Sequence, residues 1–292
     1  MPSLKDLRNR ISSVKSTKKI TSAMKMVAAA KLKRAQVNAE KTRPYAEKIK
    51  EIVNSLTDSV NKSTFKFSKK TSKEKDNNIL LIVCSADRGL CGGFNSSIVK
   101  FTNKFCNEIS SKGNNPKFIF IGKKAYNSMK KSHEKNILDF FSDFANPSIK
   151  FELAMQIRDK VLSLFFNEEI NECHIIFTRF KSAISQTVEN SKLLPLEKSE
   201  GNLPGETSNL YEYEPNQEHV LNEIIPRNIA IQIHSGLLEN MASEQGSRMT
   251  AMDNATRNAN DMIDNLTLFY NRSRQALITK ELIEIISGAE AI

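Results

Sequence analysis

Apolar residues near the start of the chain recur at alternating steps of three and four positions, which is the spacing of one helical face. The first series consists of Leu4, Leu7, Ile11 and Val14. After a polar gap, a second series follows with Ile20, Met24 and Val27. Ser3 and Asp6 have the spacing of an N-terminal cap. The stripe predicts a helix over residues 1–60 that continues past Pro44 with a bend and pairs with one partner helix.

The end of the chain carries a similar series with small residues in its middle. Its members are Met252, Ala255, Ala259, Met262, Leu266, Phe269, Ser273 and Ala276. This heptad spacing predicts a helix over residues 216–292, with a break at Pro226. A continuous helix from Leu4 to Val60 would be roughly 85 Å long, so it would form a shaft. Because the two helices flank one inserted segment, we expect an antiparallel coiled coil of the two ends.

The middle of the chain has a different pattern, in which short apolar runs alternate with helical segments. We predict strands at residues 79–84, 117–121, 137–141, 173–180 and 183–196, and helices at 98–109, 123–132 and 148–167. Apolar strands that alternate with helices favour a mostly parallel sheet covered on both faces, with an antiparallel edge. The expected fold is therefore a coiled coil plus an inserted Rossmann-like α/β domain at 79–215, joined by a linker at 61–78.

Charge is distributed unevenly along the chain, whose formal net charge is +10. The first 50 residues contain fourteen Lys or Arg and three Asp or Glu, and the region from His234 onward is net acidic. Opposite charge favours pairing of the two terminal helices with each other. The basic helix lacks the interleaved aromatic residues of a nucleic-acid-binding surface. We therefore expect no nucleic acid among the partners.

The cysteine and histidine residues of this chain do not have the spacing of a catalytic or metal-binding site. Cys84, Cys91, Cys106 and Cys173 form no CxxC pair, and we expect buried free thiols in a reducing compartment. The four histidines are scattered without ligand spacing, so we expect no metal. The basic N-terminus lacks the apolar core of a signal peptide, and no apolar run is long enough to span a membrane.

A Gly-rich loop follows the first buried strand and precedes a helix, which is where phosphate-binding loops occur. The loop, Ser85–Asn95, matches neither GxxxxGK[ST] nor GxGxxG. Two alternatives to a shaft remain open on these residues: a nucleotide-binding α/β enzyme, and a coiled-coil scaffold that forms a symmetric homodimer. Nucleotide titration of the isolated chain tests the first, and co-purification with partner subunits tests the second.

Four segments together resemble the gamma subunit of F-type ATP synthase, in the same order along the whole chain. They are KKITSAMKMVAAAK at 18–31, DRGLCGG at 87–93, ASEQGSRM at 242–249 and RQALITKELIEIISGA at 274–289. The resemblance implies a non-catalytic subunit without cofactors. It also implies one copy per complex, placed inside a hexamer of alpha and catalytic beta subunits. The α/β domain would contact the epsilon subunit and the membrane-embedded c-subunit ring.

The resemblance further implies the role of the chain and its location. Proton-driven rotation of the ring would turn the shaft, and the shaft would drive ATP synthesis, or be driven by hydrolysis, at the beta subunits. The chain would be peripheral to the membrane, on the cytoplasmic face of the bacterial inner membrane.

The same resemblance assigns roles to individual residues. Contacts to the beta subunits are expected from Met24, Lys25, Arg88, Arg248, Arg274, Gln275, Thr279 and Glu281. An apolar bearing near the free end of the helix is expected from Ile283, Ile285 and Ile286. Several of these side chains have an alternative role, which is only to hold the coiled coil together.

Overall fold

The computed structural model describes residues 3–59, 67, 77–144, 148–196 and 217–290. Its elements in chain order are α1 (Leu4–Ser59), β1 (Asn78–Cys84), α2 (Phe94–Ser111), β2 (Asn115–Ile121), α3 (Lys123–His133), a 3-10 turn (Glu134–Asn136), β3 (Ile137–Phe141), α4 (Phe151–Phe166), β4 (Glu172–Phe180), β5 (Gln186–Leu194) and α5 (Gln217–Glu290). The chain forms two compact units. We call residues 1–29 with 248–292 the coiled-coil unit and residues 30–247 the sheet unit.

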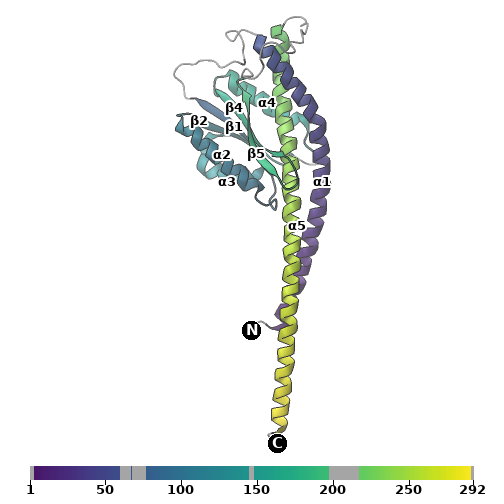
Figure 1. Ribbon diagram of the computed structural model, residues 1–292. Coiled ribbons are helices and arrows are strands. Elements are labelled where there is room, and N and C mark those ends of the chain that lie inside the picture. The colour runs from purple at the N-terminus through teal and green to yellow at the C-terminus, as the bar shows by residue number, and fades with distance from the viewer. Residues whose placement is uncertain (1–2, 60–66, 68–76, 145–147, 197–216, 291–292) are drawn as a thin grey trace. The chain divides into compact units, whose positions relative to one another are not determined.

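The sheet unit contains a five-stranded sheet in the order β3-β2-β1-β4-β5 (Figure 1). The strands β1 to β4 are parallel, and β5 pairs with β4 in the antiparallel direction. This confirms the mostly parallel sheet with an antiparallel edge. The strand boundaries agree with the prediction to within two residues except at the start of β5, which begins at Gln186 because residues 181–185 form a tight turn.

Both faces of the sheet are covered, which explains why β1 is apolar at every position after Asn78. Leu80, Ile82 and Cys84 face a core that includes α4 and the sheet-unit parts of α1 and α5. The alternate residues Ile79, Leu81 and Val83 face a second core built with α2 and α3. Successive side chains of a strand point to opposite faces, so a strand buried on both sides shows no polar alternation.

The coiled-coil unit pairs the first part of α1 with α5 in the antiparallel direction, as the sequence predicts. Three side-chain contacts define the register: Lys25 to Asp253 at 2.5 Å, Thr21 to Thr256 at 2.8 Å, and Arg8 to Tyr270 at 3.0 Å. As the residue number rises in α1, the partner number falls in α5. The N-terminal cap is confirmed, since the Asp6 amide donates to Ser3 Oγ at 3.1 Å.

The predicted apolar stripe of α1 is wrong in its second half. Ile20 and Val27 are 59% and 57% exposed, whereas Thr21 and Ala28 are buried. The inner face continues the three-four spacing of Leu4 without a shift and so reaches the polar positions 18, 21 and 25. The same face of the helix therefore stays turned to the partner helix, even where polar residues occupy that face.

The predicted seam of α5 is wrong at three positions. Met262 and Phe269 are 53% and 44% exposed, and the half-buried positions beside them are Ile263 and Tyr270. Ala276 is exposed as well. Met252 and Ala259 are buried, as predicted. The observed inner positions continue the spacing of Met252 with steps of four and three.

The predicted break at Pro226 is also wrong, because α5 runs unbroken through it. A proline inside a helix removes one backbone hydrogen bond. Here Leu221, Ile225 and Ile229 are all buried in the sheet-unit core, and this packing outweighs the local preference. The helix α1 likewise continues through Pro44, and the bend expected there stays a prediction.

Most of the segment predicted as a linker at 61–78 lies outside the described residues, as does the loop at 197–215. Within the first segment, Phe67 is buried and its ring packs edge-on against Phe166, with 5.3 Å between the ring centroids. A residue of the sheet-unit core therefore lies inside this polar stretch.

Candidate functional site

The Gly-rich loop is held in place by Asp87 and Ser85, which satisfy backbone groups of the neighbouring strands. The Asp87 carboxylate accepts hydrogen bonds from the amides of Lys123 (3.1 Å) and Asp143 (2.9 Å). The buried Ser85 hydroxyl accepts from the Ala125 amide at 3.1 Å and lies 3.1 Å from the Gly122 carbonyl. Both side chains thus join the C-terminal ends of β1, β2 and β3, which gives the motif a structural role.

Arg88 and Leu90 lie on the exposed side of this loop. Leu90 adopts a φ of 62°, a conformation that non-glycine residues rarely adopt. The loop is fastened to α5, because Ser247 Oγ donates to the Cys91 carbonyl at 2.8 Å. The Asn95 side chain also holds it, accepting from the Ala86 amide and contacting Cys91 Sγ at 3.1 Å. Of the expected beta contacts, Arg88 is the one that belongs to the sheet unit.

The four cysteines are free and buried, as the sequence predicts. Burial raises the pKa of Cys106 to about 12 and raises the pKa of Cys84 and Cys173 still further, so these three thiols stay protonated near neutral pH. No group of His, Cys, Asp or Glu in the described ranges has the arrangement of a metal site. Nor does any described helix have the length and hydropathy needed to cross a bilayer.

The expected beta contacts near the start of α1 lie at the helix pair itself. Lys25 forms an ion pair with Asp253, and Met24 beside it is half-buried. Arg248 on α5 is also half-buried. The Lys25 side chain therefore has a role in fixing the coiled-coil register, which is the structural alternative that the sequence left open.

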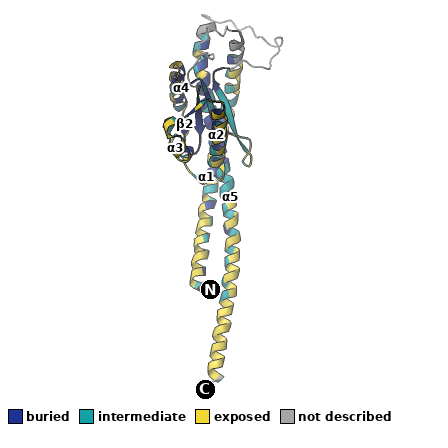
Figure 2. Cartoon of the chain, turned by 90° about the vertical axis from the view of Figure 1, so that its left-hand side faces the viewer, coloured by how far each residue is buried: buried dark blue, intermediate teal, exposed yellow. Residues whose placement is uncertain are grey.

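The expected contacts near the end of α5 lie on an unaccompanied helix. The register that joins Arg8 to Tyr270 brings the start of α1 level with about residue 273, so α1 does not reach further along α5. Every described residue from Arg274 to Ala289 is exposed, which Figure 2 shows as the yellow end of the helix. The set includes all four predicted beta contacts of this region and the three residues of the predicted bearing: Arg274, Gln275, Thr279, Glu281, Ile283, Ile285 and Ile286.

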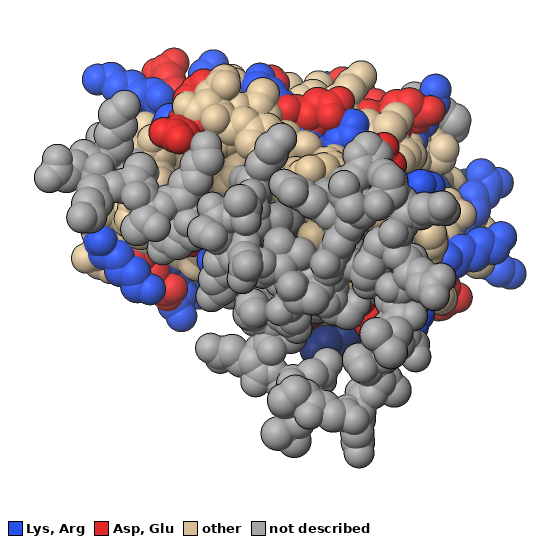
Figure 3. All heavy atoms as spheres, turned by 90° about the horizontal axis from the view of Figure 1, so that it is seen from above, with Lys and Arg blue, Asp and Glu red and all other residues tan. Residues whose placement is uncertain are grey.

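Apolar side chains are unusually exposed in the coiled-coil unit. They lie on both helices and are Ile20, Met26, Val27, Met262, Leu268, Phe269, Leu277, Ile278, Leu282, Ile283, Ile285 and Ile286. Exposed apolar surface of this extent marks a surface that contacts other proteins. Figure 3, the view from above, shows both acidic and basic side chains around the margin of that face.

Sequence reasoning missed a polar anchor that fastens α5 to β4 within the sheet unit. Side chains of α5 bind the β4 backbone beyond the end of its pairing with β1. The Phe180 amide donates to Glu239 at 3.0 Å. The Thr178 amide donates to Asn240 at 3.2 Å, and the Thr178 carbonyl accepts from Ser243 at 2.9 Å. All three helix side chains are buried. Polar residues beside Leu237 and Leu238 in an apolar helix were the available signal.

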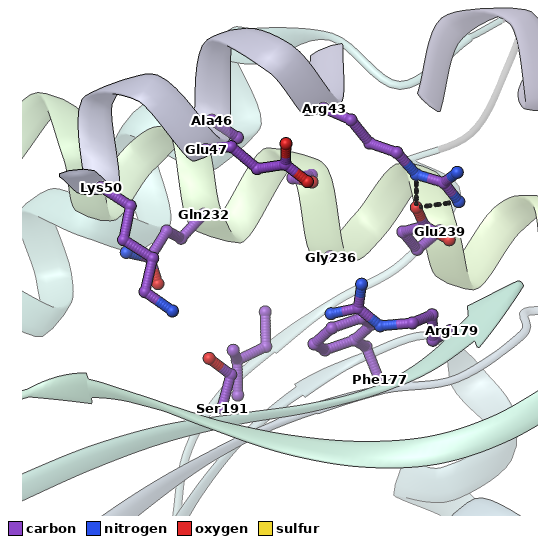
Figure 4. A pocket seen from close by; sticks show the side chains of 12 residues that line it. Arg43, Ala46, Glu47, Lys50, Phe177, Arg179, Ser191, Gln232, Gly236 and Glu239 are labelled. Atoms are coloured by element: carbon purple, nitrogen blue, oxygen red, sulfur yellow. Dashed lines mark hydrogen bonds and ion pairs between the residues drawn. The ribbon is translucent and has the colours of Figure 1, made fainter. Parts of the chain in front are cut away.

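Arg43 of α1 completes this anchor. Its guanidinium binds the Glu239 carboxylate, with 2.6 Å between Nη2 and Oε1. Figure 4 shows the pair at one end of a groove of about 260 Å³ between α1, α5 and the strands β4 and β5. Arg179, which also lines the groove, is paired with Glu189 at 2.6 Å. Both arginines are therefore neutralised by carboxylates, and the other charged residues of the lining are one of each sign, Lys50 and Glu47.

Reversing the charge of Lys25 (Lys25→Glu) is expected to lower the thermal unfolding temperature of the chain, because two carboxylates would then face each other across the helix pair. The double variant with Asp253→Lys should restore only part of the loss, since Arg257 also binds Asp253 at 2.8 Å. Thermal unfolding followed by circular dichroism gives the unfolding temperature of both variants. An unchanged unfolding temperature in Lys25→Glu would show that this ion pair does not stabilise the coiled coil.

The effect of the Lys25 pair should depend on pH. The hydrogen bond from Lys25, helped by Arg257, holds the pKa of Asp253 below its usual range. A carboxyl group with a lowered folded-state pKa stabilises the fold above its unfolded-state pKa, and this contribution is lost as the pH falls through the folded-state value. The difference between wild type and Lys25→Glu should therefore be largest near neutral pH and shrink in acid.

Comparisons with known proteins agree over the full length of the chain. Residues 3–292 match a family model described as ATP synthase. The chain is 48% identical over 292 residues to the ATP synthase gamma chain of Sinorhizobium medicae, and 47% identical over 299 residues to that of Rhodospirillum rubrum, with 100% of each chain covered in both cases.

Solved structures share the fold. A chain of the Euglena gracilis mitochondrial ATP synthase has a TM-score of 0.71 at 20% identity, with 99% of this chain and 94% of that chain covered. A chain of the central stalk and c-ring structure of the Tetrahymena thermophila mitochondrial ATP synthase has a TM-score of 0.61 at 25% identity, with coverage of 81% and 99%.

An antiparallel pair of terminal helices, an inserted α/β sheet and an exposed apolar helix end together define a stalk subunit, a class of protein that works through contacts with other subunits. The full-length relatives narrow this class. The chain belongs to the ATP synthase gamma chain family, which confirms the resemblance noted in its sequence.

Proposed function

We propose that this chain is the central rotor shaft of an F-type ATP synthase. In this role it couples proton-driven rotation of a c-subunit ring to ATP synthesis, or hydrolysis, at catalytic beta subunits. The full-length identity to gamma chains supports the proposal. The observation that carries it is the end of α5, where a helix without a partner exposes apolar side chains from Leu277 to Ile286. Such a helix needs an enclosing apolar surface, and the cavity of an alpha and beta hexamer supplies one.

The chain itself is proposed to be non-catalytic. The Gly-rich loop uses Asp87 and Ser85 to bind backbone amides, so these groups are not available to a substrate. Three of the four thiols are held protonated by burial. The chain would then act by position and shape, as one copy per complex, with ATP chemistry confined to the beta subunits.

The proposed partners are the alpha and beta subunits around the coiled-coil unit, and the epsilon subunit and c-ring at the sheet unit. The bacterial source of the relatives supports a location at the cytoplasmic face of the inner membrane, as a peripheral subunit. Co-expression with the alpha and beta subunits tests this assignment directly. The expected product is one complex that contains a single copy of this chain per hexamer, and a stable symmetric homodimer of the chain in its place would contradict it.

Within the proposed complex, the contacts to beta are assigned to Met24, Lys25, Arg88, Arg248, Arg274, Gln275, Thr279 and Glu281. The exposure of the last four supports the assignment, because their side chains are accessible to a partner. Ile283, Ile285 and Ile286 are assigned to a bearing. Aliphatic contacts have no directional bonds to break, so a helix end of this kind can turn against its surroundings.

Replacing Arg274 and Gln275 together by alanine should slow ATP hydrolysis by the assembled complex about fivefold. A fivefold change in rate corresponds to about 1 kcal/mol of activation free energy, which is what an exposed charged contact contributes. Both side chains are exposed, so the fold of the chain should be unaffected. The measurement is the steady-state hydrolysis rate of complexes with equal subunit content.

The matched control for this pair is the double alanine variant at Asn271 and Arg272, which removes the same charge one turn earlier on the same exposed helix. Its rate should stay near that of the wild type. Equal losses in the two double variants would contradict a specific contact at Arg274 and Gln275, and would favour contacts distributed along the helix.

A further inference from the structure

The helix α5 approaches β4 most closely at two glycines. A Cβ atom at Gly236 would be 3.1 Å from the Ile175 side chain, and one at Gly246 would be 3.1 Å from the Phe180 ring. The two glycines are separated by about 15 Å along the helix. A larger side chain at either position would push the helix away from the strand. The glycines therefore fix where α5 rests on β4.

The polar anchor, which consists of Arg43, Glu239, Asn240 and Ser243, lies on α5 between these two glycines. Asn240 and Ser243 bind the amide and the carbonyl of the same residue, Thr178, at 3.2 and 2.9 Å. A hydrogen bond weakens steeply when its distance or angle changes. A movement of the strand along the helix would therefore break both bonds together.

The Glu239 carboxylate joins three elements at this level. One of its oxygens accepts from the Phe180 amide of β4 at 3.0 Å, and the other accepts from Arg43 of α1 at 2.7 Å. The Arg43 guanidinium also donates to the Phe180 carbonyl, at 3.5 Å. Both helices are thus bound to the same end of the same strand by directional contacts.

Apolar side chains make much of the remaining contact between α5 and the sheet. Those of α5 are Leu221, Ile225, Ile229, Ile233, Leu237 and Leu238. Apolar burial has no preferred direction, so these contacts oppose separation of the helix from the sheet more than they oppose twisting. Resistance to twisting is therefore expected to be concentrated at the polar anchor.

We propose that the polar anchor is the joint that carries torque between the sheet and the two helices of the shaft. The inference rests on the proposed function, in which rotation enters the chain at the sheet unit. In this role Glu239, Asn240 and Ser243 are positioning residues, which hold α1 and α5 at a fixed angle on β4 while load is applied. The joint and the proposed bearing then have opposite properties, because only the joint is built from directional bonds.

The torsional stiffness of the assembled complex tests the joint. The hexamer is fixed to a surface and stalled with a non-hydrolysable nucleotide, and a bead attached through Lys135→Cys, an exposed position of the sheet unit, reports angular fluctuations. The four native cysteines of the chain are buried, so the bead attaches to this chain at position 135. The double variant Asn240→Leu with Ser243→Ala should lower the stiffness by about half, because it removes both bonds to Thr178.

Leu237→Ala is the matched control, because Leu237 is a buried apolar residue of the same helix segment. It should lower the unfolding temperature of the chain at least as much as the double variant. Its torsional stiffness should nevertheless stay near that of the wild type. If stiffness fell in step with the unfolding temperature in both variants, general packing would carry the load and the joint would be refuted.

Ser243→Ala alone is a milder form of the test, which replaces one hydroxyl by a hydrogen and keeps a residue that favours the helix. Its stiffness should fall by about a quarter, and its rate of ATP hydrolysis without load should stay unchanged. Unchanged stiffness in this variant would overturn the inference. A wild-type complex whose sheet unit does not rotate during hydrolysis would instead contradict the proposed function.

Discussion

Replacing Glu239 by alanine is expected to reduce the free energy of unfolding of the sheet unit by about 3 kcal/mol, at the lower end of the range for breaking a buried ion pair. The Glu239 side chain is 4% exposed, and its loss leaves both Arg43 and the Phe180 amide without their acceptor. We take the lower end because the Arg43 side chain is 39% exposed and water can partly replace its partner. For a unit of this size the unfolding temperature should fall by about 6–12 °C.

The control is Glu189→Ala, which removes the carboxylate of the neighbouring pair with Arg179. That pair has a similar distance, 2.6 Å, but its two side chains are 48% and 35% exposed. Its loss should cost at most about 1 kcal/mol. Thermal unfolding followed by circular dichroism compares the two variants. Equal shifts would show that burial of Glu239 does not set its contribution.

The intermediate variant Glu239→Gln separates charge from hydrogen bonding. A glutamine keeps an oxygen that can accept from the Phe180 amide but loses the charge that binds Arg43. Its expected loss lies between those of Glu239→Ala and the wild type. Since this anchor joins α5 to β4, the same variants also measure how strongly the helix is held on the sheet.

The fold could be predicted from sequence wherever burial alone determines the pattern. The strand at Ile79–Cys84 is apolar because both its faces are covered, and its limits were predicted to within one residue. The helix at Lys123–His133 was predicted at residues 123–132, so its limits also agree to within one residue. In these elements local preference and tertiary packing agree.

The inner faces of the long helices could not be predicted correctly from apolar residues alone. In α1 the seam passes through Thr21 and Lys25, which bind Thr256 and Asp253, while the apolar Ile20 and Val27 point outward. A protein whose exposed surface is apolar by function breaks the assumption that apolar residues face the partner helix. The exception therefore coincides with the surface proposed to contact other subunits.

The residues of the candidate site also divide into those that the sequence could indicate and those that it could not. The end of α5 was predicted as a contact region from its resemblance to the family, and this contact stays a prediction; the register of the coiled coil explains why the region is exposed. The contacts of Glu239, Asn240 and Ser243 could not be predicted, because polar residues in an apolar helix indicate a buried polar contact but do not identify its partners, which are backbone groups of β4.

Gly122→Ala is expected to be the most damaging single substitution in the sheet unit, with a loss of at least about 4 kcal/mol in the free energy of unfolding. Gly122 has a φ of 99°, and a Cβ atom there would lie 2.2 Å from the Ser85 carbonyl oxygen. The neighbour is backbone at the end of β1, so the overlap cannot be relieved by rotating a side chain. Strain from the backbone conformation adds to the overlap.

Gly113→Ala separates the two contributions, because Gly113 also has a positive φ, of 75°, but has nothing within 4 Å of the position of a Cβ. Its expected loss is about 1–2 kcal/mol, which is the backbone strain alone. Chemical denaturation of both variants gives the comparison. If they lost equal stability, close packing of Ser85 on Gly122 would not be what fixes this corner of the sheet. With the expected difference, Gly122→Ala should also displace the loop that presents Arg88 and Leu90, because Ser85 and Asp87 bind the residues that follow Gly122.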